Sequence, residues 1–332
     1  MNSHILVLCD TEEEYAQHMS EFLKGHKEVP WMIYTYSDVD ELLDFAGREQ
    51  IEVLVVAEKA YTREVNELSV GRKILLNESG LMKWESVINV DKYQKAETVY
   101  KEILNACMDV TDLQFPRLKV LSDVHFIGMY SPVRRCLQTP FALTLGQILA
   151  AKHRTLYLNF EHYAGISELM PDIQSRDLAD LLYFLTAQQD KFRLWMQSIL
   201  MKKGEMDYIP PMKAGQNLLG IQAEEWQQLL QNIAQTGEYE YVILDLSESM
   251  QGLFDILRIC DKVFTLTKED AAARSKILQY EQVLALYERE DILEKTCKYK
   301  LPLFQKLPDQ IEYYTKGDLA DYVSKVIREE LE

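Results

Sequence analysis

The turn at residues 131–139, SPVRRCLQT, has the composition and position of a candidate anion-binding loop. It follows an apolar segment of strand length and opens a helical segment, which is where phosphate groups bind in parallel α/β proteins. Arg134 and Arg135 supply guanidinium groups that can hold an anion. The alternative is a solvated turn in which both arginines face water. Ser131 begins the turn and Gln138 ends it.

Three more residues carry oxygen atoms that suit a divalent cation. Thr139 opens the helix after the turn, where it is either a Mg²⁺ ligand or a helix cap. Asp245 ends the apolar segment YEYVILD, and Glu161 follows the apolar segment RTLYLNF. Because ligands bind at the carboxyl ends of parallel strands, Asp245 is the stronger candidate. We expect Thr139 and Asp245 to hold a metal only if a magnesium nucleotide binds.

Other site chemistries lack their motifs. The chain has no HExxH, no GxSxG, and no GxGxxG after a strand. Its five cysteines form no CxxC pair and no Cys/His cluster with zinc spacing. Widely spaced, unpaired cysteines and an N-terminus unlike a signal peptide predict a reduced, cytoplasmic protein.

Alternation of strand-like and helix-like segments organises the whole chain. It predicts two doubly wound α/β domains with parallel sheets, the first flavodoxin-like and the second larger. We place the first domain at residues 1–112, a linker around Pro116 at 113–119, and the second domain at 120–332. The sheets then bring the candidate site residues to their carboxyl edges.

The charge balance excludes two classes of partner. The chain has 36 basic and 53 acidic residues, a net charge of −17. Phosphate affinity comes from Lys and Arg clusters, so we expect no nucleic-acid binding and no strong direct membrane binding. The last helical segment has an apolar stripe and a mostly acidic opposite face, so it is predicted to pack on its own domain or on a partner.

The second domain resembles the MinD/ParA ATPases with a deviant Walker A loop, and specifically the TadZ/CpaE group of pilus-assembly proteins. That group joins an atypical receiver-like domain to the ATPase domain. The family loop reads SPKGGxGKT, and Ser131, Pro132 and Thr139 match it. By the same resemblance Asp245 stands at the Walker B aspartate and Glu161 in switch I, where Asn159 replaces its usual partner carboxylate.

The loop departs from that family where phosphate binding needs it most. Val133 and Gln138 stand at the two lysines, while Arg134, Arg135 and Leu137 stand at the three glycines. A phosphate cradle needs left-handed backbone angles that glycine adopts freely, and a Cβ there costs about 1–2 kcal/mol. We therefore expect both the cradle geometry and the catalytic charge to be lost.

The first domain resembles a response-regulator receiver only in part. Asp10 follows the first strand, Ser79 the fourth and Lys92 the fifth, as in a receiver. The third strand ends at Ala57, with Glu58 next, so the phosphoacceptor aspartate is absent. Glu58 either imitates a permanent charge or is a solvated glutamate. We expect a vestigial site that accepts no phosphate.

These observations favour a pseudo-ATPase, a non-catalytic scaffold or localisation factor for a pilus or secretion apparatus. We expect a homodimer with protein partners of that apparatus, recruited through them to the membrane or a cell pole, and no resident cofactor. The alternative is a slow nucleotide-dependent switch that binds ATP and Mg²⁺, with an arginine in the place of the lysines.

Overall fold

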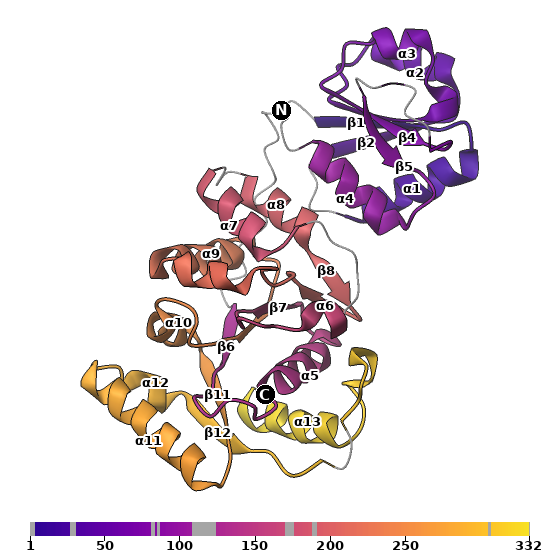
Figure 1. Cartoon of the computed structure of the whole chain (residues 1–332). Helices are drawn as coiled ribbons and strands as arrows, with labels where there is room; N and C mark the ends of the chain where they lie inside the picture. The colour runs from indigo at the N-terminus through magenta and orange to yellow at the C-terminus, as the bar shows by residue number, and fades with distance from the viewer. Residues whose placement is uncertain are drawn as a thin grey trace. The chain divides into compact units, whose positions relative to one another are not determined.

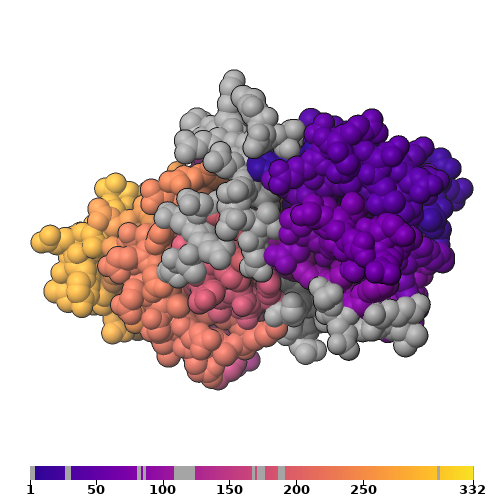
Figure 2. All heavy atoms as spheres, turned by 90° about the horizontal axis from the view of Figure 1, so that it is seen from above, coloured from indigo at the N-terminus to yellow at the C-terminus, as the bar shows by residue number. Residues whose placement is uncertain are grey.

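The structure is a computed structural model of the chain, and it describes residues 4–26, 31–80, 84, 87–107, 124–169, 176–187, 191–304 and 307–331. The chain divides into two compact units, Met1–Arg117 and Leu118–Glu332. Figure 1 traces both units by colour along the chain, and Figure 2 shows the molecular surface in the same colours. The predicted linker at 113–119 lies outside the described residues.

The first unit is built on a five-stranded parallel sheet in the order β2-β1-β3-β4-β5. Its strands are β1 (His4–Cys9), β2 (Trp31–Tyr36), β3 (Val53–Ala57), β4 (Arg72–Asn77) and β5 (Ile88–Asp91). This is the strand order of flavodoxin-like domains. Strand β3 is buried along its whole length, as apolar strands in a sheet covered on both faces must be.

Helices cover both faces of this first sheet (Figure 1). One pair, α1 (Glu13–Gly25) and α4 (Ala96–Ala106), packs together, and so does the other, α2 (Val39–Ala46) and α3 (Arg63–Glu67). The two pairs lie on opposite sides of the sheet. A short 3-10 helix, η1 (Glu58–Ala60), follows β3 directly. The loops at the carboxyl edge of the sheet carry the candidate residues Asp10, Glu58, Ser79 and Lys92.

The second unit is built on a seven-stranded sheet in the order β12-β11-β6-β10-β7-β9-β8. Its strands are β6 (His125–Met129), β7 (Thr155–Asn159), β8 (Met201–Lys203), β9 (Met206–Tyr208), β10 (Tyr241–Asp245), β11 (Lys262–Thr267) and β12 (Thr296–Lys300). All neighbours are parallel except β8 and β9, which pair antiparallel at the edge. The predicted doubly wound α/β class is confirmed for both units.

The helices of the second unit put the candidate loop at a topological switch point. Helix α5 (Gln138–Ala150) leads from β6 toward β7 and packs with α13 (Asp318–Glu330) on one side of the sheet. The chain from β10 to β11 passes by α10 (Leu253–Ile259) on the other side, which also carries α9 (Ala223–Thr236) and α11 (Ala271–Leu286). Ligands bind in such a crevice, at the carboxyl ends of the strands.

The remaining elements complete the cover of the second sheet. They are α6 (Ile166–Leu169), α7 (Leu178–Ala187), α8 (Phe192–Ile199), α12 (Asp291–Glu294), η3 (Gly215–Gly220) and η4 (Ile311–Tyr313). The apolar stripe of α13 is buried on its own unit, with Leu319, Val323 and Val326 in the same core as α5. In the described part of the chain, no helix is long and apolar enough to cross a membrane.

Candidate functional site

The loop between β6 and α5 keeps a left-handed backbone where its sequence has no glycine. Arg134, Arg135 and Leu137 have φ values of 61°, 48° and 65°. The loss of the glycines predicts that this geometry is lost too, but the structure keeps the left-handed φ values. The start of the loop is tied down, because Ser131 Oγ donates to Leu266 O at 2.5 Å and accepts from Val133 N at 3.2 Å. Such contacts offset the cost of the side chains in that backbone region.

The two arginines do not converge on the loop as a replacement for lysine. Arg134 forms an ion pair with Glu248, on the segment after β10. Arg135 is exposed. An ion pair between groups as exposed as Arg134 and Glu248 contributes little to stability, about 0–1 kcal/mol. The structure therefore places one guanidinium on a carboxylate and the other in solvent.

Asp245 is fully buried, and both of its carboxylate oxygens accept hydrogen bonds from side chains of the same chain. Gln138 Nε2 donates to Oδ1 at 2.7 Å, and Oδ2 accepts from Tyr157 Oη at 2.9 Å and from Asn159 Nδ2 at 3.1 Å. A side-chain hydrogen bond from Thr139 joins them. The sequence groups Asp245 with Thr139 as possible metal ligands, and the structure brings them together as partners of each other.

The Gln138 side chain is held by hydrogen bonds at the carboxyl end of β10. Besides Asp245, its Nε2 donates to Leu246 O at 2.9 Å. Both partners are acceptors, so the amide nitrogen is the atom that faces them. The Gln138 side chain thus points at the end of β10, and it presents a neutral amide rather than a cation at the start of α5.

Two carboxyl groups lie near each other in this site. Burial raises the pKa of Asp245, and the hydrogen bonds from Gln138, Thr139, Tyr157 and Asn159 oppose the rise. Burial, then the charge of Asp245, raises the pKa of Glu161 to about 7, and Arg134 opposes it. Glu161 N donates to Asn159 Oδ1 at 2.9 Å, which fixes the start of the segment after β7.

In the first unit, the carboxyl edge of the sheet holds an internal ion-pair network around Lys92. The Lys92 side chain is fully buried and its Nζ lies 2.8 Å from Asp10 Oδ2, 3.1 Å from Glu78 Oε1 and 3.3 Å from Glu12 Oε2. Burial lowers the pKa of Lys92, but the hydrogen bonds that Lys92 donates to Asp10 and Glu78 outweigh this effect, so the pKa is raised. The ammonium group thus compensates the carboxylates from within the protein.

A second lysine and the glutamate after β3 complete this edge. Lys59 Nζ lies 2.8 Å from both Glu12 Oε1 and Glu78 Oε2. Glu58 accepts from Ser79 Oγ and from Ser79 N, each at 2.9 Å. The structure therefore assembles Asp10, Glu58, Ser79 and Lys92 at one edge, with Glu58 tied to a loop rather than solvated alone.

We predict that small phosphodonors do not phosphorylate the first unit. Ala57 ends β3 and Glu58 follows it, so no aspartate stands at the acceptor position, and Asp10 is engaged by Lys92. Acetyl phosphate with Mg²⁺ followed by mass spectrometry of the intact chain should show no added phosphate. A phosphate located on Asp10 or Glu58 would contradict this.

Sequence reasoning missed three contributors to these sites. Tyr157, Lys59 and Glu78 are each drawn in by contacts across the fold, such as the bond from Tyr157 to Asp245, 88 residues away. No local pattern announces such partners. Also missed was a cleft beside the loop, lined by residues of α10 and α11. Within the described ranges, no group of three or more His, Cys, Asp or Glu is placed to hold a metal ion.

Comparisons with known proteins gave likenesses of structure alone. No family model matches the chain and no curated protein matches it. Among solved structures, a ParA family ATPase from Chlorobium tepidum is 16% identical, covers 61% of this chain and 93% of that chain, and has a TM-score of 0.45. A chain of the MinC:MinD cell division protein complex of Aquifex aeolicus is 15% identical, covers 63% of this chain and 98% of that chain, and has a TM-score of 0.46. A putative plasmid partition protein from Borrelia burgdorferi, bound to AMPPNP, is 12% identical, covers 63% of this chain and 100% of that chain, and has a TM-score of 0.44.

Proposed function

We propose that this protein is a non-catalytic scaffold of TadZ/CpaE type, a pseudo-ATPase whose nucleotide site is closed by its own side chains. The observation that carries the proposal is the filled carboxylate of Asp245. Gln138, Tyr157 and Asn159 all donate to it, and the first of these stands where the family has its phosphate-binding lysine.

The chemistry of phosphoryl transfer explains why this closure matters. Such catalysis is almost entirely positioning and charge stabilisation by lysine, Mg²⁺ and backbone N–H groups. Here the lysine is an amide that is already bonded, and Arg134 is paired with Glu248. A nucleotide would have to displace internal hydrogen bonds of a buried carboxylate without bringing a cationic side chain into place.

A slow nucleotide-dependent switch is the second candidate. The left-handed backbone at Arg134, Arg135 and Leu137 favours it, because the path of a phosphate cradle survives the loss of its glycines. The exposed pair of Arg134 with Glu248 is weak enough for a phosphate to replace the carboxylate.

ATP separates these two candidates. We predict that millimolar ATP with Mg²⁺ leaves the melting temperature unchanged relative to Mg²⁺ alone. A ligand at 100 times its Kd would stabilise by about 2.7 kcal/mol, and the expected scale is roughly 2–4 °C per kcal/mol. Calorimetry measures the shift, and isothermal titration checks for binding.

If ATP does raise the melting temperature, two variants show which site binds it. A shift abolished by Arg134→Ala with Arg135→Ala would establish the switch and refute the closed site. A shift that survives this double substitution and disappears with Asp245→Ala would assign binding to a metal-centred site. Either outcome would overturn the pseudo-ATPase.

The proposed scaffold role also implies an oligomeric state, a location and a class of partner. We propose that the protein forms a homodimer, is cytoplasmic, and reaches the membrane or a cell pole through protein partners of a pilus or secretion apparatus. The family resemblance supports these proposals, and the buried apolar stripe of α13 fits them because that helix is occupied by its own unit.

A further inference from the structure

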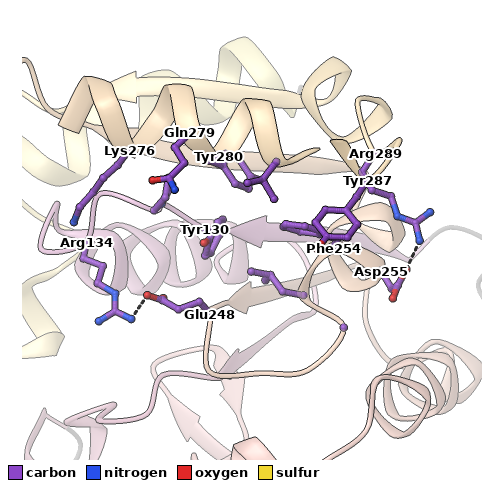
Figure 3. A pocket seen from close by; sticks show the side chains of 14 residues that line it. Tyr130, Arg134, Glu248, Phe254, Asp255, Lys276, Gln279, Tyr280, Tyr287 and Arg289 are labelled. Atoms are coloured by element: carbon purple, nitrogen blue, oxygen red, sulfur yellow. Dashed lines mark hydrogen bonds and ion pairs between the residues drawn. The ribbon is translucent and has the colours of Figure 1, made fainter. Parts of the chain in front are cut away.

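A cleft of about 750 Å³ lies beside the loop, between the beginning of α10 and the length of α11. Figure 3 shows Arg134 and Lys276 at one end of it, Asp255 and Arg289 at the other, and aromatic side chains between them. Its volume falls in the range of small-molecule sites, roughly 300–1,000 Å³. Asp245, Gln138 and Thr139 are not among its lining residues, so the cleft is distinct from the Asp245 site, although Pro132 and Arg134 of the loop line one end of it.

The middle of the cleft is a wall of rings. The ring centroids of Tyr130 and Tyr280 are 5.4 Å apart, and Phe254 lies 6.3 Å from both Tyr280 and Tyr287. Tyr287 is exposed although it is large and apolar. Rings at such spacings offer faces and edges to a further ring, which gains about 0.5–1.5 kcal/mol beyond the area it buries.

One polar atom in this wall has no partner. Tyr280 is 7% exposed, and its hydroxyl is buried without a hydrogen bond in the part of the chain that the structure describes. Buried hydroxyl groups are usually satisfied, because leaving one without a partner is costly. The missing partner of the Tyr280 hydroxyl is explained if an atom of a ligand in the cleft forms a hydrogen bond with it.

The charges of the cleft favour an anion. Its lining includes Arg134, Lys276 and Arg289 against two carboxylates, Glu248 and Asp255, a balance of three minus two in a chain with a net charge of −17. Glu248 and Asp255 are paired with Arg134 and Arg289. Lys276 bonds only a backbone oxygen, Val133 O at 3.3 Å, among the contacts of the described residues. Its charge is therefore available to a ligand.

We propose that this cleft binds a small planar aromatic or heteroaromatic molecule that carries a carboxylate or a phosphate. The ring lies among Tyr130, Phe254 and Tyr280, and the anionic group meets Lys276. A hydrogen-bond acceptor on the ring takes the proton of the Tyr280 hydroxyl. The proposal does not depend on whether the loop binds ATP.

The test uses anilinonaphthalene sulfonate, a fluorescent aromatic anion, with the full chain. We expect saturable binding at one site, displaced by naphthoate or by naphthyl phosphate, and the tighter competitor identifies the preferred anion. Neutral naphthalenemethanol should compete at least about tenfold more weakly, which is the value of one charge-assisted contact. Displacement by neither anion, or equal displacement by the neutral compound, would overturn the proposal.

Matched variants on α11 locate the site. Gln279 and Gln282 are both exposed on this helix, but only Gln279 lines the cleft. Gln279→Trp should abolish dye binding by filling the cleft, while Gln282→Trp should leave the affinity within about twofold. Lys276→Gln should weaken binding about tenfold. Dye binding that is indifferent to Gln279→Trp would place the dye elsewhere and refute the assignment.

Tyr280→Phe separates a ligand contact from a structural role. The variant keeps the ring and removes the orphaned hydroxyl, so the unliganded protein should melt at a higher temperature. The affinity for the displacing anion should fall about fivefold because one hydrogen bond is lost. A raised melting temperature with unchanged affinity would remove Tyr280 from the site and contradict the proposed contact.

Discussion

Replacing Lys92 with methionine should destabilise the first unit by about 3–5 kcal/mol, because it leaves buried carboxylates without their counter-charge. The side chains of Lys92 and Asp10 are both fully buried, and Glu78 is nearly so. On the scale for a small domain, the melting temperature of this unit should fall by more than about 10 °C. Differential scanning calorimetry of the full chain measures the loss.

Lys59→Met is the matched control for that variant. Lys59 contacts Glu12 and Glu78, as Lys92 does, but its side chain is 59% exposed. Its removal should cost no more than about 1 kcal/mol. Since the folded-state pKa of Lys92 is raised above its usual 10.5, its contribution is complete below that pH and is lost only above it. Equal losses for the two variants at neutral pH would show that the network does not stabilise the unit through its buried member.

If the proposed closure is right, placing the glycines and the lysine of the MinD/ParA loop in this chain should create ATP binding. The variant combines Arg134→Gly, Arg135→Gly and Leu137→Gly with Gln138→Lys. The three positions already have left-handed φ values, so glycine requires no change of backbone and exposes the N–H groups. Lysine at 138 supplies the missing cation. We expect millimolar ATP with Mg²⁺ to raise the melting temperature by about 5 °C or more.

The three-glycine variant that keeps Gln138 is the control, and it should show a much smaller shift. Comparing the two variants isolates the contribution of the lysine from that of the exposed backbone. If the fourfold variant is folded and still shows no shift with ATP, side chains of the loop are not what closes the site. The closure proposed from Gln138 and Asp245 would then be wrong.

The sequence predicted the fold well because the fold depends on local patterns. The five apolar segments of the first unit became β1 to β5 in the expected parallel sheet. In the second unit, β6, α5, β7 and β10 lie where the periodicity placed them. The short antiparallel pair β8 and β9 was not predicted, since three-residue strands carry too few residues for an alternating pattern.

The site was harder to predict because its decisive contacts join distant residues. The apolar segment YVILD predicts that Asp245 ends a buried strand. It does not predict that Gln138 and Tyr157 donate hydrogen bonds to the Asp245 carboxylate. The loop was misjudged for a different reason. Propensity assigns a cost to Arg134, Arg135 and Leu137 in left-handed regions, whereas the tertiary contacts of Ser131 and Lys276 hold the loop in place.

The left-handed loop also bears on how phosphate-binding backbone geometry is recognised. Motif searches are keyed to glycines, because glycine ordinarily marks these backbone angles. In this chain the angles persist under arginine and leucine, so the sequence signature and the conformation have separated. A search by consecutive backbone dihedrals after a buried parallel strand would collect such loops whatever side chains they carry. Loops that keep this conformation without glycine would then be found by the path of the main chain.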